Sequence, residues 1–257
     1  MPLNNQQKQH IQHVIATCLL NKFQNYGAEN NFMPFHFRLL GKDRLALYSF
    51  MQSLLTTFGT SIFEPVAAAL AGTKFAKVET HFTVGNSIYS NCQQSVQTII
   101  NQLTINPKPD KIKELKLLRN SLSGTINKLK PAKVDLFVEN ERGEQYFFDL
   151  KTAKPNKGDF QKYKQTLLEW AGIVYTANKN AKVHTLIAIP YNPYEPELYQ
   201  FWTLAGMLDL NEEIKVAEKF WDFLGGEGAY IELLDCFEKV GMELRPEIDR
   251  YFAKFNK

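Results

Sequence analysis

The residue types that could do chemistry gather between Pro131 and Lys151. Asp135 belongs to one apolar run of strand-forming residues, and Asp149 and Lys151 end a second such run. The turn Glu141-Arg142-Gly143 between them suits a three-residue hairpin loop, with glycine in the left-handed position. The expected β-hairpin places Asp135 opposite Asp149, with Cβ atoms roughly 5 Å apart. Lys151 shares their face, because side chains alternate along a strand.

Two carboxylates and an ammonium at one place suit metal-assisted phosphate chemistry. Like charges this close are destabilising unless a cation neutralises them, and hard oxygen ligands suit Mg²⁺. A lysine beside the metal can orient or deprotonate an attacking water, while the metal stabilises charge on a phosphate. The alternative is a surface ladder of solvated charges. The apolar run Tyr146-Phe147-Phe148 before Asp149 favours a site instead.

The acid-x-Lys spacing is a weak signal by itself. It occurs three times in the chain, at Glu114/Lys116, Asp149/Lys151 and Glu213/Lys215. Only the middle copy ends a strand-like run and has an aspartate on a preceding strand that can pair with it. The site prediction therefore depends on the hairpin.

This hairpin resembles the core of the PD-(D/E)XK nuclease superfamily, with Asp135 as the first acid and Asp149-Leu150-Lys151 as the D-X-K element. The proline lies four residues before Asp135 rather than directly before it. The resemblance implies an α/β fold: a mixed β-sheet flanked by helices, with helical N- and C-terminal additions. It also implies catalytic roles for Asp135, Asp149 and Lys151, and Mg²⁺ at Asp135, Asp149 and Leu150.

Nucleases of this superfamily often carry another acid on a helix ahead of the hairpin. Glu64 is our catalytic candidate, because Glu64-Pro65 reads as the start of a helix. A favourable charge at a helix N-terminus explains Glu64 equally well. Glu79 is the second choice for the extra acid.

A length of 257 residues suits one large domain or two small ones, and 44% hydrophobic residues support a core. The resemblance implies a single nuclease domain over residues 1–257. We expect a helical part (1–125), a catalytic α/β core (126–192) and a mostly helical part (193–257). Three widely spaced cysteines indicate reduced thiols in a cytoplasmic protein. The N-terminus lacks an apolar signal core, and no stretch approaches the roughly 18 apolar residues of a membrane span.

Positive charge surrounds the expected site although the net charge is only +3. Residues 108–133 hold eight Lys or Arg against two acids, and residues 151–164 hold five Lys against one. This distribution is what an approaching phosphate backbone requires, whereas any single lysine is more simply a solvated side chain. The DNA-binding candidates are Lys154, Lys157, Lys162, Lys164 and Gln165. Base-reading candidates that we cannot rank are Arg38, Arg44, Lys179, Lys182 and His184.

Hydrophobic periodicity predicts helices over 5–26, 43–58, 88–105, 110–122 and 160–177, with Asp159 as the N-cap of the last. Residues 27–44 look irregular. Residues 182–190 read as a buried strand, and a strand–helix–strand crossover implies that it pairs in parallel with the Asp149 strand. Residues 197–257 are expected to be mostly helical, with a glycine turn at 225–228 and a last helix from Arg245-Pro246.

Strings outside the hairpin make the whole chain similar to the TdeIII-type family of Type II restriction endonucleases, from roughly Glu64 onward. They are Phe148-Asp-Leu-Lys-Thr152, Gln165-Thr-Leu-Leu-Glu169-Trp170, Pro190-Tyr-Asn-Pro-Tyr194, Glu218-Lys-Phe-Trp-Asp-Phe-Leu-Gly-Gly226 and Leu244-Arg-Pro-Glu-Ile-Asp249. Accessory roles for Gln165 and Glu169 are possible.

This resemblance implies a Mg²⁺-dependent endonuclease that cuts double-stranded DNA at a short palindrome of GGNCC type. It also implies a cognate DNA methyltransferase, and a palindrome is naturally read by a two-fold homodimer. Two alternatives stay open. One is another PD-(D/E)XK nuclease, for repair or junction resolution, and the other is a catalytically silent DNA-binding protein of the same fold.

Overall fold

The computed structural model describes residues 3–26, 33–151, 159–199 and 206–253, and it shows a mixed α/β protein. The helices are α1 (Asn5–Asn25), α2 (Pro34–Leu40), α3 (Lys42–Thr57), the π-helical η1 (Phe58–Phe63), α4 (Glu64–Ala71), α5 (Ser90–Ile105), α6 (Lys111–Asn120), α7 (Phe160–Ala177), α8 (Glu218–Gly225), α9 (Ala229–Glu243) and α10 (Arg245–Phe252). The strands are β1 (Lys77–Thr80), β2 (Thr83–Tyr89), β3 (Ile126–Lys133), β4 (Leu136–Glu139), β5 (Glu144–Leu150), β6 (Lys182–Ile189) and β7 (Ile214–Val216).

The central sheet has five strands in the order β1-β4-β5-β6-β7. β1, β4 and β5 pair antiparallel, whereas β5, β6 and β7 pair in parallel. Helix α7 makes the crossover from β5 to β6, so the expected parallel pairing is confirmed. The sheet draws β1 and β7 from outside residues 126–192, where short strands were not expected.

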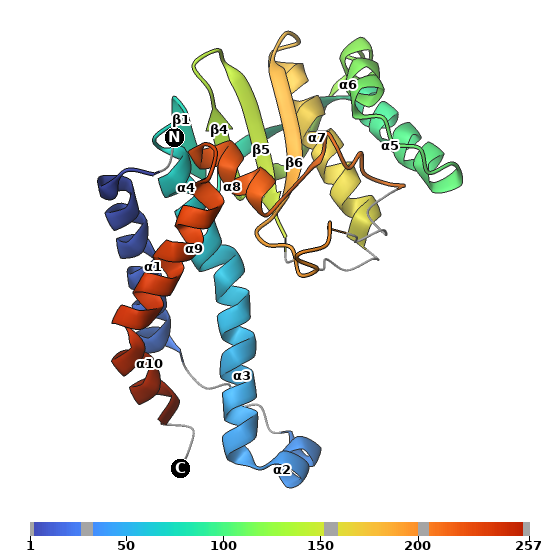
Figure 1. Ribbon diagram of the computed structural model, residues 1–257. Helices are drawn as coiled ribbons and strands as arrows, with labels where there is room; N and C mark the ends of the chain where they lie inside the picture. The colour runs from blue at the N-terminus through green and yellow to red at the C-terminus, as the bar shows by residue number, and fades with distance from the viewer. Residues whose placement is uncertain (1–2, 27–32, 152–158, 200–205, 254–257) are drawn as a thin grey trace.

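Helices cover both faces of this sheet (Figure 1). One core packs Phe137, Phe147 and Ile187 against α7, with α5 and α6 packed beyond it. The other core packs Phe148 and Leu186 against α4, α8 and α9. Neighbouring residues of β5 therefore enter opposite cores, as the two-residue period of a strand requires.

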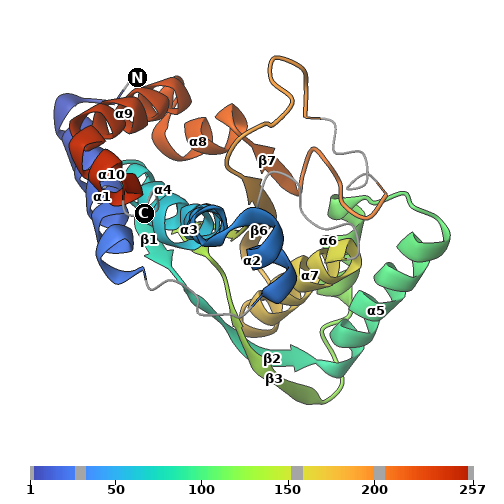
Figure 2. The ribbon, with the colours of Figure 1, turned by 90° about the horizontal axis from the view of Figure 1, so that it is seen from below.

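A separate two-stranded ribbon, β2 with β3, extends from the sheet towards α5 (Figure 2). Residues 131–133 belong to this ribbon, so the hairpin strand that we expected to begin near Pro131 begins at Leu136. Ile88 likewise lies in β2, and the helix expected from residue 88 begins at Ser90. Gly172 lets α7 approach the ribbon, because a Cβ there would lie 2.7 Å from Ile88 Cδ1.

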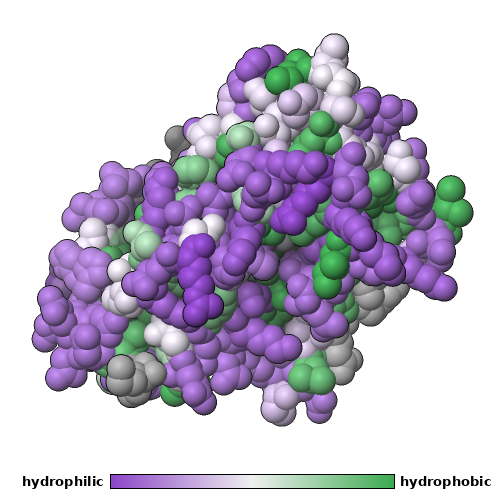
Figure 3. All heavy atoms as spheres, turned by 90° about the horizontal axis from the view of Figure 1, so that it is seen from above, coloured by the Kyte–Doolittle hydropathy of each residue, from purple (hydrophilic) through white to green (hydrophobic). Residues whose placement is uncertain are grey.

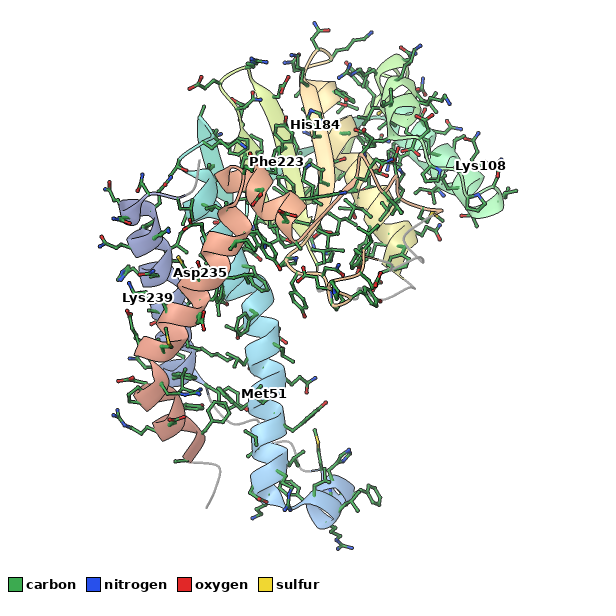
Figure 4. All side chains as sticks on the ribbon, in the orientation of Figure 1. Met51, Lys108, His184, Phe223, Asp235 and Lys239 are labelled. Carbon is green, nitrogen blue, oxygen red and sulfur yellow. The ribbon has the colours of Figure 1, made fainter. Side chains whose placement is uncertain are left out.

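Helices α2 and α3 form an arm that projects from the body at the end of the sheet towards which β5 runs (Figure 1). The expectation of irregular structure over 27–44 was wrong for the described residues 33–44, because Pro34 begins α2 and Gly41, at φ 83°, separates it from α3. Met51 lies on α3 away from the sheet and is exposed (Figure 4).

From Glu218 onward the chain follows the expected pattern of helices, whereas residues 206–217, which were expected to be mostly helical, form turns and strand β7. The glycine turn separates α8 from α9, and α10 begins at Arg245. No single helix among the described residues is long and apolar enough to cross a membrane; one bent pair, Lys42–Thr57 with Ser61–Ala71, passes by length and composition alone.

Candidate active site

The β4–β5 hairpin has the register that the sequence predicts. Leu136 pairs with Phe148 and Glu139 with Gln145, across a turn in which Gly143 has φ 73°. Asp135 directly precedes β4, and its backbone amide donates to the Phe148 carbonyl at 3.1 Å. Continuing the same register places Asp135 opposite Asp149, at the end of the sheet where β5 stops.

Hydrogen bonds hold the three polar side chains of this hairpin in place. The Leu150 amide donates to Asp135 Oδ2 at 2.7 Å, and Lys151 Nζ donates to Asp149 Oδ1 at 2.5 Å. The Lys151 amide donates to the Ala188 carbonyl at 2.9 Å, which continues the parallel pairing of β5 with β6 beyond Leu150. The chain therefore brings together Asp135, Asp149 and Lys151, as expected.

Glu64, at the start of α4, brings a third carboxylate to the same region. Its side chain is 3% exposed, and burial, followed by the charges of Asp135 and Asp149, raises the pKa of Glu64 to about 7. Burial is also the main cause that raises the pKa of Asp149 to about 6, with Asp135 adding to it and Lys151 opposing it. The site thus holds more negative potential than Lys151 alone compensates.

Glu79, our second choice for the extra acid, lies elsewhere. It is opposite Phe137 in β1 and forms an ion pair with Lys77 at 2.8 Å. Of the two candidates, Glu64 is the carboxylate whose pKa is raised by the charges of the hairpin aspartates.

The donor chemistry of this site fits a hard divalent cation. Among the described residues, no three His, Cys, Asp or Glu side chains already form a metal-binding group. Mg²⁺ however usually takes only one or two protein carboxylates and completes its shell with waters and substrate phosphate. Asp135 and Asp149 supply that number, and Glu64 Oε2 is a buried oxygen without a hydrogen-bond donor in the described part of the chain. A cation here would favour the charged forms of these carboxylates, and so oppose the burial and the repulsion that raise their pKa values.

Two site residues were missed by the sequence analysis. Tyr163, on the first turn of α7, places its ring centroid 5.1 Å from Lys151 Nζ. His81 lies between β1 and β2, with Nε2 3.4 Å from Glu64 Oε2. Neither lies in a motif, and only the crossover of α7 and the end of β1 bring them to the hairpin.

Asp159 precedes α7 as expected, but its side chain makes no capping hydrogen bond.

We expected Lys164 to bind DNA, but the structure buries it, so DNA cannot reach it. Its side chain is 0% exposed, and its ammonium pairs with Glu114 Oε2 at 2.5 Å and Glu213 Oε2 at 2.6 Å. Lys111 pairs with the other oxygen of Glu213 at 2.7 Å. These four charges form a buried network between α6, α7 and the segment before β7, and the two other acid-x-Lys copies contribute their glutamates to it.

The remaining DNA-binding candidates divide by position. Lys162 is exposed on α7, and Lys154 and Lys157 lie outside the described residues. Gln165 donates to Glu169 at 2.7 Å and lines a groove of about 300 Å³ between α5 and α7, together with Ser90, Gln93, Gln94 and Gln97. The candidate roles of Lys162 and Gln165 in DNA binding stay predictions.

Among the base-reading candidates, Lys182 and His184 lie near the start of β6, at the opposite end of the sheet from Asp149 (Figure 4). The surface at that end is mostly hydrophilic (Figure 3). Lys182 pairs there with Glu144 at 3.2 Å, and the His184 ring stacks on Tyr146 with centroids 4.5 Å apart. Arg38 is exposed on α2 and Arg44 is exposed on α3, so both lie on the arm.

Known proteins resemble this chain over most of its length. The family model described as "Type II restriction endonuclease, HinfI" matches residues 3–241, and the TdeIII type is not confirmed by it. The Type II restriction enzyme HgiCII of Herpetosiphon aurantiacus is 25% identical over 230 residues, which cover 87% of this chain and 82% of the relative. HgiEI of the same organism is 24% identical over 86% of this chain and 81% of its own length. MjaII of Methanocaldococcus jannaschii is 26% identical over 82% of this chain and 59% of its own length. The chain belongs to the HinfI family of Type II restriction endonucleases, which are site-specific deoxyribonucleases.

Proposed function

We propose that this protein hydrolyses phosphodiester bonds of double-stranded DNA at a short palindromic sequence, with Mg²⁺ held at Asp135, Asp149 and the backbone of Leu150. The observation that carries the proposal is the convergence of two facing carboxylates and Lys151 at the end of β5. Glu64 supports it as a third carboxylate with a raised pKa.

Each side chain has a distinct task in this proposal. Bound Mg²⁺ would stabilise charge on the phosphate and lower the pKa of a bound water. Asp135 is oriented by the Leu150 amide, and Asp149 is oriented by Lys151. The Lys151 ammonium is the donor that positions the attacking water. Glu64 adds negative charge beside the hairpin, where it favours retention of a cation. Hydrolysis leaves a 5′-phosphate and a 3′-hydroxyl.

The palindromic target supports a homodimer, because a two-fold axis presents one active site to each strand. We propose a GGNCC-type target from the resemblance in the sequence strings. A cognate DNA methyltransferase would protect the host's own copies of that sequence. We propose a cytoplasmic location for the nuclease, because its DNA substrate would be met there.

Cleavage of plasmid DNA with Mg²⁺ tests the proposal. The wild type is expected to give discrete fragments, whose sequenced ends define the target, and Asp149→Ala is expected to give none. Lys116→Ala is the matched control, because Lys116 ends another acid-x-Lys copy but is exposed on α6. A smear that Asp149→Ala abolishes would indicate a repair or junction-resolving nuclease. DNA binding without cleavage by the wild type would indicate a silent DNA-binding protein.

A further inference from the structure

His81 has an unusual backbone conformation at the edge of the active site. Its φ is 53°, and Ala217, at 47°, is the other non-glycine residue with positive φ in the described ranges. L-amino acid residues other than glycine rarely adopt this backbone region, although asparagine, aspartate and histidine are enriched in it. Such conformations persist where the surrounding structure enforces them, often beside functional groups.

Two contacts tie His81 to the catalytic carboxylates. Its backbone amide donates to the Asp135 carbonyl at 3.2 Å, which holds the end of β1 against the start of β4. Its Nε2 lies 3.4 Å from Glu64 Oε2. The left-handed backbone therefore holds the ring over the buried carboxylate, while its amide pairs with Asp135.

The two side chains differ in their exposure to solvent. The His81 side chain is 66% exposed, whereas the Glu64 side chain is 3% exposed. Glu64 Oε2 accepts no formed hydrogen bond from the described residues, and His81 Nε2, 3.4 Å away, is a nitrogen atom that can donate to it. A positive φ by itself does not indicate a functional residue, because Ala217 has a similar φ and no polar side chain.

We propose that His81 is a positioning residue of the nuclease, whose imidazole Nε2–H holds the Glu64 carboxylate towards Asp135 and Asp149. This inference rests on the proposed function. A neutral ring protonated at Nε2 is sufficient for this task. His81 acts through Glu64, so its loss should slow the chemical step and leave the affinity for DNA unchanged.

The test uses variants that keep the backbone conformation accessible. In His81→Gly the left-handed φ is unstrained, and in His81→Asn it is tolerated but the shorter side chain does not reach Glu64. Ala217→Gly is the control, because it relaxes the other positive φ far from the hairpin in sequence. We expect both His81 variants to melt no lower than the wild type, to bind DNA as tightly, and to cleave bound DNA at least about 10-fold more slowly in single turnover. Ala217→Gly should cleave at the wild-type rate.

A double-mutant cycle with Glu64→Gln separates action through Glu64 from direct contact with DNA. If His81 acts through Glu64, His81→Gly has little further effect in the Glu64→Gln background. Additive losses, or wild-type single-turnover cleavage by His81→Gly, overturn the inference and leave the proposed function intact. If the wild type does not cleave DNA at all, the proposed function fails instead. The same double-mutant cycle, measured by urea unfolding, then tests the contact between His81 and Glu64. Non-additive changes in the free energy of unfolding support the inference, and additive changes overturn it.

Discussion

The Asp135 carboxylate accepts a 2.7 Å hydrogen bond from the backbone amide of Leu150 on the neighbouring strand. This bond links the catalytic geometry to the register of the hairpin, because Leu150 lies between Asp149 and Lys151. A slip of one residue would turn Asp149 and Lys151 to the other face of the sheet. The same pairing that closes the β4–β5 ladder therefore assembles the charges of the site.

Two substitutions of Asp135 should separate its hydrogen bond to the Leu150 amide from the contribution of its negative charge to cleavage. Asp135→Asn keeps an oxygen that can accept from the Leu150 amide, whereas Asp135→Ala leaves that amide unpaired. Both variants lose a negative charge at the proposed metal position, so we expect cleavage to fall by more than about 100-fold. Only Asp135→Ala should also lose about 1–3 kcal/mol of unfolding free energy in urea titrations. Equal stability of the two variants would contradict the stabilising role of this hydrogen bond.

Tyr163 should support Lys151 through its ring. Tyr163→Leu removes a cation–π contact worth about 1–2 kcal/mol, so the single-turnover cleavage rate should fall about 5- to 30-fold. Tyr163→Phe keeps the ring and should cleave within about twofold of the wild type. If the phenylalanine variant were as slow as the leucine variant, the hydroxyl group rather than the ring would be required.

Lys164 and Lys162 are neighbours in sequence with opposite expected effects. Lys164→Met leaves Glu114 and Glu213 with Lys111 as the remaining cation of the buried network, so the unfolding free energy should fall by about 3–5 kcal/mol. Its DNA affinity, measured where the variant is folded, should be unchanged.

Lys162→Met should change stability by less than about 0.5 kcal/mol, because this side chain is exposed. If Lys162 contacts a phosphate, the slope of log affinity against log salt should become shallower by about 0.9. An unchanged slope would remove Lys162 from the DNA-binding surface.

In the metal-free protein, Glu64 and Asp149 should contribute less to stability as the pH rises. Glu64 and Asp149 have raised pKa values in the folded state, about 7 and about 6, so each binds protons more tightly when folded than when unfolded. Their contribution is fully present below the unfolded values, about 4.3 and 3.9, and is lost as the pH rises through the folded ones. The melting temperature of Glu64→Gln should therefore depend less on pH between about 4 and 7 than that of the wild type. If the two proteins had the same pH dependence, the pKa of Glu64 would not be raised in the folded state.

Added Mg²⁺ or Ca²⁺ should reverse this loss. A cation bound to the folded state alone stabilises it by mass action, and it binds best once the carboxylates are ionised. The increase in melting temperature on adding the cation should be larger at pH 8 than at pH 5, and it should be absent in Asp149→Ala.

Local rules were sufficient to predict the β4–β5 hairpin and most helices from the sequence. Strand alternation and a three-residue turn ending in Gly143 set which side chains face each other across β4 and β5. Helical periodicity located α1, α3 and α7, and a buried apolar run located β6. These signals lie within a few residues of the structure that they specify, so no distant contact was needed.

The tertiary structure alone decided which distant residues join the hairpin and which charges are available. The sequence offered Glu64 as the first choice and Glu79 as the second choice for the extra acid, and packing of α4 buried Glu64 near Asp135 and Asp149. It likewise offered Lys162 and Lys164 as equivalent cations, and the packing of α6 and α7 buried Lys164 between two glutamates. His81 and Tyr163 carried no signal at all. Burial and proximity depend on residues far apart in the chain, so they appear only when the helices and the sheet pack together.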